Sequence, residues 1–99
     1  MSDSNQFKPL DQLTFETVTT HRLRLITLID SAQSDEIHCD LTEVHTCDSA
    51  GLAFLMDAHR LSRQRSKRLV IGHLTNDIRA LAKLYGVEHI LMIGETRES

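Results

Sequence analysis

The chain has 99 residues, of which 40% are hydrophobic and 25% are charged, so it is long enough for one domain with its own core but not for two. Its formal net charge of −3, with three phenylalanines, one tyrosine and no tryptophan, disfavours nucleic acid as a partner. No apolar run approaches the roughly eighteen residues of a membrane span, and the N-terminus lacks a signal-peptide pattern. We therefore expect a cytoplasmic domain with no direct membrane insertion.

The first third of the chain predicts one strand and one helix. Residues 1–10 are mostly polar and Pro9 disfavours regular structure, so a flexible N-terminus is expected there. Residues 13–18 alternate apolar and polar side chains, which predicts a strand. Residues 20–32 carry leucines and isoleucines at helical spacing, with Thr20 as the expected N-cap.

The middle of the chain predicts alternating strands and helices. Residues 36–44 alternate and should form a strand, and a helix is expected to follow over residues 50–65. Residues 68–74 are a short apolar run, typical of a strand that is buried on both faces. A third helix is predicted over residues 77–85, with Tyr85 on its apolar face.

The end of the chain adds one further element. Gly86 should end the third helix as its C′ residue, and residues 88–94 fit either a last strand or a short helix. Residues 95–99 are expected to form a flexible tail. Elements that alternate in this way build a largely parallel sheet with helices packed on it, so residues 11–94 are predicted to form one α/β domain.

Asp48 and Ser49 lie where a predicted strand gives way to a predicted helix. That junction places both side chains at the C-terminal edge of the sheet, where open α/β sheets usually bind their ligands. Three interpretations compete. Ser and Asp are preferred N-caps, because their oxygens accept hydrogen bonds from the first turn of a helix. Alternatively, the serine is a nucleophile or a site of regulation.

Patterns for catalysis and for metal binding are weak. A nucleophile elbow needs G-x-S-x-G, but Cys47 stands two residues before Ser49. The six histidines show no metal-binding spacing, and no glycine-rich phosphate loop is present. Cys39 and Cys47 form no CxxC pair and lie in apolar surroundings, so we interpret them as buried thiols. We therefore expect no enzyme activity, no metal and no cofactor.

The helix that follows Ser49 begins with unusually many apolar residues. Residues 52–56 are apolar around nearly the whole helix, and polar residues return from Asp57 onward. A helix that lies on one side of a sheet needs only one apolar stripe. Either neighbouring helices bury the excess, or it forms a partner-binding surface near Ser49.

The segment IHCDLTEVHTCDSAGLAFLMDAHRL, residues 37–61, resembles the signature of the STAS domain family of sulphate transporters and anti-sigma factor antagonists. The signature consists of a strand, Asp-Leu-Ser/Thr, a Val, a buried position, then Asp-Ser/Thr, two small residues and Leu. The matching positions are Asp40, Leu41, Thr42, Val44, Cys47, Asp48, Ser49, Ala50, Gly51 and Leu52. In addition, LAKLYGVEHIL, residues 81–91, is similar to the third helix of MlaB-type members, the STAS subunits of Mla phospholipid transporters.

The resemblance implies a single STAS-type α/β domain with a mixed, mostly parallel sheet and helices packed on one face. It implies no catalysis. In MlaB-type members, the residue that matches Ser49 lies against the ATPase of an inner-membrane ABC transporter that maintains lipid asymmetry, so the subunit is peripheral to that membrane. In anti-sigma factor antagonists, a partner kinase phosphorylates the matching residue. The expected partner-binding residues are Asp48, Ser49, Ala50, Gly51, Ala53, Phe54 and Asp57.

Overall fold

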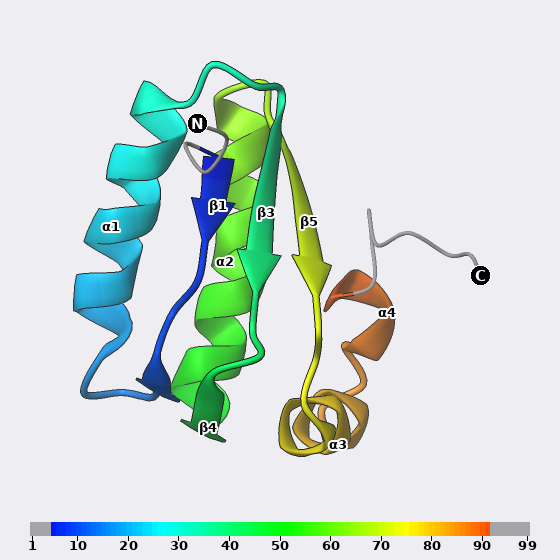
Figure 1. Ribbon diagram of the computed structural model, residues 1–99. Helices are drawn as coiled ribbons and strands as arrows, with labels where there is room; N and C mark the ends of the chain where they lie inside the picture. Colours follow the sequence, from blue (N-terminus) through cyan, green and yellow to red (C-terminus); the bar gives the residue numbers. More distant parts are fainter. Residues whose placement is uncertain (1–4, 92–99) are drawn as a thin grey trace.

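The computed structural model describes residues 5–91, and this part of the chain forms five strands and four helices (Figure 1). In chain order they are β1 (Gln6–Phe7), β2 (Asp11–Leu13), α1 (Val18–Ser31), β3 (Glu36–Asp40), β4 (Val44–Cys47), α2 (Ser49–Gln64), β5 (Arg68–Gly72), α3 (Asn76–Leu84) and α4 (Glu88–Leu91). No helix in residues 5–91 has both the length and the apolarity to cross a bilayer.

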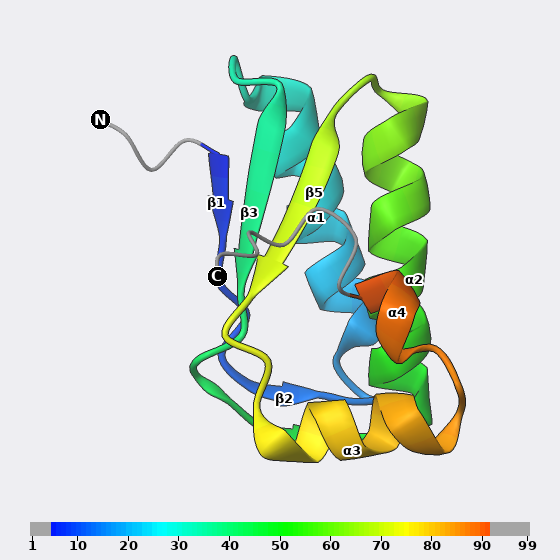
Figure 2. The ribbon, with the colours of Figure 1, turned by 90° about the vertical axis from the view of Figure 1, so that its right-hand side faces the viewer.

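The strands form two parallel arrangements. β1, β3 and β5 make a three-stranded sheet in the order β1-β3-β5, and β2 pairs with β4. Seen from the side, α1 and α2 lie together on one face of the larger sheet, while α3 lies across the end where β5 terminates (Figure 2). The predicted α/β fold with helices on one face is confirmed, and all the strand pairings among the described residues are parallel.

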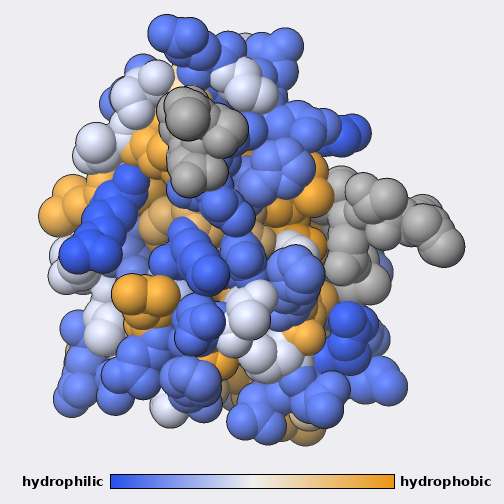
Figure 3. All heavy atoms as spheres, in the orientation of Figure 1, coloured by the Kyte–Doolittle hydropathy of each residue, from blue (hydrophilic) through white to orange (hydrophobic). Residues whose placement is uncertain are grey.

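The opposite face of the β1-β3-β5 sheet is polar. Ile37 and Cys39 of β3 point into the core, whereas His38 between them is exposed. Figure 3 views this face, on which hydrophilic residues predominate. The prediction that residues 68–74 are buried on both faces is therefore wrong: only Leu69 and Ile71 are buried, and Val70 between them is half-buried.

The hydrophobic core lies between the larger sheet and the two long helices. Strands contribute Ile37, Cys39 and Ile71 to it, and helices contribute Leu25 and Leu55, each at most 2% exposed. Burial of side chains of this size stabilises the fold by roughly 1.5–3 kcal/mol each. The apolar side of α2 therefore anchors the helix whose first turn carries Ser49.

The N-terminal segment differs from its predicted structure. β1 forms in a stretch expected to be flexible, because Phe7 is buried and pairs with Cys39 of β3. The strand predicted over residues 13–18 is wrong, since β2 ends at Leu13. The Thr17 hydroxyl accepts a hydrogen bond from the backbone N–H of Thr14 and donates one to the carbonyl of Gln12. These two bonds close a turn. Consequently α1 begins at Val18 with Thr17, not Thr20, as its N-cap.

The remaining elements follow the sequence pattern closely. The predicted strand 36–44 ends early, as β3 at Asp40, because the Asp40 carboxylate accepts hydrogen bonds from the backbone and side chain of Thr42. β4 then begins at Val44. The Thr75 hydroxyl caps α3, and Gly86 ends it with a φ of 71°. The last element is the short helix α4, and expectations for residues 1–4 and 92–99 lie outside the described residues.

Gly51 in the first turn of α2 lies close against the backbone of β2. A Cβ atom at this position would lie 1.8 Å from the carbonyl oxygen of Leu13 in β2 and 3.1 Å from the Cys47 sulfur. We expect Gly51→Ala to destabilise the domain by about 2–3 kcal/mol. The new methyl group would collide with the backbone of β2, which cannot rotate away as a side chain can. The gain in helix propensity, about 1 kcal/mol, is too small to offset this.

Gly72 in β5 is the matched control, because no atom lies within 4 Å of the Cβ position there. Gly72→Ala should change the free energy of unfolding by less than about 1 kcal/mol. Urea unfolding of both variants, compared at equal m-values, measures the difference. Equal midpoints for the two variants would show that α2 does not need this close approach.

Candidate partner-binding site

The predicted site lies at the end of the domain where α2 begins. β4 ends at Cys47, Asp48 forms the junction, and Ser49 opens the helix. β2, β4, the start of α2 and α3 all lie at this end (Figure 2). Because β3 and β5 run toward the same end, the site is at the C-terminal edge of the sheet, as the sequence predicts.

Asp48 is the N-cap of α2. One carboxylate oxygen accepts a hydrogen bond from the backbone N–H of Gly51 at 2.9 Å, and the other accepts from the N–H of Phe15 at 3.0 Å. The hydrogen bonds from Phe15 and then Gly51 lower the pKa of this carboxyl below its usual value of 3.8. Its backbone N–H also donates to the carbonyl of Leu13. Asp48 thus joins the β2–α1 loop to α2.

Ser49 is the first residue of α2 and does not cap it. The residue is exposed, and its hydroxyl has no hydrogen-bond partner among residues 5–91. The interpretation of Ser49 as a helix cap is therefore wrong, because Asp48 already supplies the capping oxygen. What remains at Ser49 is a free hydroxyl at the positive end of a 16-residue helix.

Two of the predicted contact residues are buried and shape the site from beneath. Gly51 packs against β2, and Phe54 is only 5% exposed. The Phe54 ring lies 6.1 Å from the ring of Phe7 and 6.3 Å from that of His21. Ala53, by contrast, is exposed one turn after Ser49. The surface at this end of α2 is therefore formed by small side chains over a packed aromatic cluster.

Two hollows flank this surface of α2. The apolar hollow, about 320 Å³, separates the first turns of α2 from the α3–α4 connection and is lined by Ser49, Leu52, Ala53, Met56, Tyr85 and Val87. The inter-helix hollow, about 240 Å³, lies toward α1 and is lined by Val18, Thr19, Arg22, Ala50, Ala53, Phe54 and Asp57. Ala53 borders both, so the exposed part of α2 is a ridge between two depressions.

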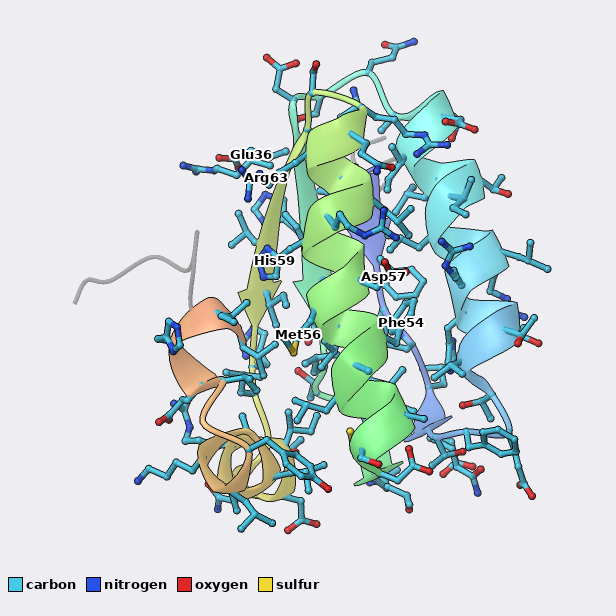
Figure 4. The ribbon with its side chains drawn as sticks, turned by 180° about the vertical axis from the view of Figure 1, so that it is seen from behind. Glu36, Phe54, Met56, Asp57, His59 and Arg63 are labelled. Carbon is cyan, nitrogen blue, oxygen red and sulfur yellow. The ribbon has the colours of Figure 1, made fainter. Side chains whose placement is uncertain are left out.

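Asp57 closes the far end of the inter-helix hollow. Its carboxylate accepts a hydrogen bond from Arg22 of α1 at 3.0 Å and from Arg60 of α2 at 3.0 Å. Partial burial alone would raise the pKa of this carboxyl, but the two guanidinium groups outweigh that effect and lower it. In Figure 4, Phe54 and Asp57 both point from α2 toward α1. The ion pairs hold the two helices together beside the site.

Exposed apolar side chains that sequence reasoning missed stand on both sides of Ser49. Phe15 is 78% exposed in the loop that is bonded to Asp48, and Tyr85 is 53% exposed at the rim of the apolar hollow. Tyr85 was expected on the buried face of a helix, but α3 ends at Leu84 and turns it outward. Large apolar residues exposed in this way are typical of contact surfaces.

The thiols and histidines give no sign of a reaction centre. Burial, followed by the nearby Asp40, raises the pKa of Cys39 to about 12, and burial with Asp48 raises that of Cys47 to about 11. Cys39 is a buried thiol as predicted, whereas Cys47 is only half-buried, and the raised pKa of each thiol keeps it protonated near neutral pH. Among the described residues, no three His, Cys, Asp or Glu side chains are placed to hold a metal ion.

The charge of Asp48 should make the cap depend on pH. Asp48→Asn keeps one capping oxygen but places an amide N–H₂ opposite the N–H of Phe15, so the variant should be about 1 kcal/mol less stable at pH 7. Because folding lowers the pKa of Asp48, its contribution is present above pH 3.8 and is lost as the pH falls through the folded-state pKa. Urea midpoints of the two proteins should therefore converge as the pH falls below 3.8. A difference that stays constant from pH 7 to pH 3 would contradict the role of the carboxylate charge.

Comparison with known proteins supports the fold described above. A family profile described as "Mlab, STAS domain" matches residues 12–94. Comparison with curated proteins gives no match. Among solved structures, the anti-sigma factor antagonist SpoIIAA in its unphosphorylated form has a similar fold, with a TM-score of 0.71 and 16% sequence identity over 99% of this chain and 85% of that chain. Because the family profile covers most of the chain, including the whole of α2, this protein belongs to the STAS domain family.

Proposed function

We propose that this STAS domain is a non-enzymatic subunit that binds and supports the ATPase of an Mla-type phospholipid ABC transporter, with the surface around Ser49 as the contact. The family profile that matches is described as that of MlaB, which supports this choice of partner. The domain would then act in the cytoplasm and be held at the inner membrane through its partner subunits. Its role is to help the transporter maintain lipid asymmetry.

One observation carries the proposal: Ser49 and Ala53 form a ridge of small side chains between two hollows. Small side chains let a partner backbone approach α2 closely, and the hollows on either side accept larger side chains. Phe15 and Tyr85 add exposed apolar area at the rim. STAS domains act through contacts with other proteins, and this end of the domain has the chemistry of such a contact.

A second function remains open because the hydroxyl of Ser49 is exposed and unpaired among the described residues. A kinase could reach it, and the helix dipole favours the charge of a phosphate, about −1.5 to −2, at this position. The alternative function is an anti-sigma factor antagonist that is switched by phosphorylation of Ser49. Incubation with ATP and a cognate anti-sigma factor kinase, followed by mass spectrometry, tests it; an unmodified Ser49 would contradict it.

Substitutions at Ser49 test the proposed contact. Ser49→Ala should leave stability nearly unchanged, because Ser49 is not the cap, and Ser49→Asp should also fold, because the first turn of a helix favours negative charge. In the complex, however, aspartate would bury an unpaired charge beside Leu52 and Met56. We expect Ser49→Asp to weaken binding of the purified ATPase subunit at least about thirtyfold, and Ser49→Ala only a few-fold.

Thr27→Asp is the matched control, because Thr27 is exposed on α1 and lines neither hollow. Titration calorimetry with the ATPase, after circular dichroism has shown that all variants are folded, measures the effects. Binding of Ser49→Asp at the affinity of the wild type would place the ATPase contact elsewhere on the domain.

A further inference from the structure

The exposed side of α2 continues as a single stripe well beyond Ser49. Ser49, Ala53, Met56, Arg60 and Arg63 are spaced by four, three, four and three residues, so they lie along one face of the helix. All are exposed except Met56, which is half-buried. From the first to the last of them the stripe is about 21 Å long, at 1.5 Å per residue. This spacing is the one by which helices pack on other helices.

A third, larger depression lies along the far half of the stripe. This basic hollow, about 570 Å³, lies between α2 and α4 and is lined by Met56, His59, Arg60, Arg63, Gln64 and Ile90. Met56 also lines the apolar hollow, so the two depressions adjoin along the same side of α2, and we refer to them together as the groove. In Figure 4, Met56, His59 and Arg63 extend from α2 on the side away from α1, where α4 lies. The groove is therefore apolar at its Ser49 end and basic at its Arg63 end.

The basic end has polar groups without partners. Of its two arginines, Arg60 is paired with Asp57, whereas Arg63 has no carboxylate partner within residues 5–91. His59 is 9% exposed, and its Nε2 atom is buried without a hydrogen-bond partner in the same part of the chain. No carboxylate lines either half of the groove. The unpaired guanidinium of Arg63 therefore fits a negatively charged group, whereas the Nε2 atom of His59 is covered and makes no contact in the groove.

An amphipathic helix is the occupant that fits this groove best. A stripe of about 21 Å matches four turns of a helix, whose side chains repeat at the same spacing of three and four residues. The small side chains of Ser49 and Ala53 allow close approach at one end, and the guanidinium of Arg63 offers a bidentate site for a carboxylate at the other.

We propose that the stripe from Ser49 to Arg63 seats a helix of the ATPase partner whose contacting face is apolar at the Ser49 end and acidic at the Arg63 end. This inference rests on the proposed function. It makes Arg63 a specificity-determining residue of the contact, although Arg63 lies about four helical turns from Ser49. Charge at this end selects the orientation in which the partner helix lies along α2.

Charge reversal at Arg63 tests the inference. Arg63→Glu should weaken binding of the purified ATPase subunit about tenfold or more at low salt, and the loss should shrink as salt is added. Arg24→Glu is the control, because Arg24 is an exposed arginine of α1 that lines none of the three hollows. It should change affinity less than about twofold. Circular dichroism and urea midpoints establish that both variants are folded.

A charge swap then identifies the partner helix. Overlapping peptides that span the ATPase are tested for competition, and the competing peptide should be amphipathic with Asp or Glu toward one end. Replacing that acidic residue by Lys should weaken its binding to the wild type and restore its binding to Arg63→Glu. A purely structural role of Arg63 would not produce this rescue.

Four results would overturn the inference, and each would point to a different explanation. If the wild type does not bind the ATPase, the proposed function fails and the inference fails with it. If Ser49→Asp abolishes binding but Arg63→Glu binds normally, the function stands and the contact ends before Arg63. If Arg63→Glu and removal of residues 92–99 both tighten binding, the chain's own C-terminal residues occupy the groove. If the wild type is a dimer that Arg63→Glu separates, the occupant is a second copy.

Discussion

The carboxylate of Asp48 is the interaction on which the rest of the site depends. Its two oxygens accept hydrogen bonds from two segments that are distant in sequence, the first turn of α2 and the loop after β2. These bonds hold α2 at the distance where Gly51 meets the carbonyl of Leu13, a distance that no side chain would allow. The cap and the glycine therefore act together, and they place Ser49 and Phe15 on the same rim of the domain.

Local chemistry explains why the α2 region could be predicted from the sequence. The capping residue, the small residues and the apolar run lie next to one another, and they act within the first two turns of the helix. Helices α1, α2 and α3 were placed to within a few residues for the same reason, and Gly86 ends α3 as expected. What the sequence pattern left ambiguous was which of two adjacent capping residues supplies the oxygen. Only the geometry shows that it is Asp48.

The elements that could not be predicted depend on distant contacts. β1 has only two residues and exists because Phe7 pairs with Cys39 of a strand 32 positions later. The apolar residues Leu13 and Phe15 share an alternating pattern, but Thr17 closes a turn between β2 and α1 and leaves Phe15 in solvent. Tyr85 is exposed because α3 ends one residue before it. Both exposed aromatic residues of the site therefore arise where a regular element stops, which periodicity cannot anticipate.

Because Asp48 caps α2 and Ser49 does not, the side chain at Ser49 can change without altering the fold. Asp48 carries the capping bonds, so the position of its carboxylate is set by the fold. Ser49 makes no bond that the fold needs, yet it stands at the same helix terminus and borders the apolar hollow. A change in size or charge at Ser49 therefore alters what can dock on α2 while the core beneath, from Gly51 to Leu55, keeps its packing. The N-terminus of α2 thus has two functions that are carried by adjacent residues. Asp48 holds the domain together, and Ser49 presents a surface that can change without loss of stability.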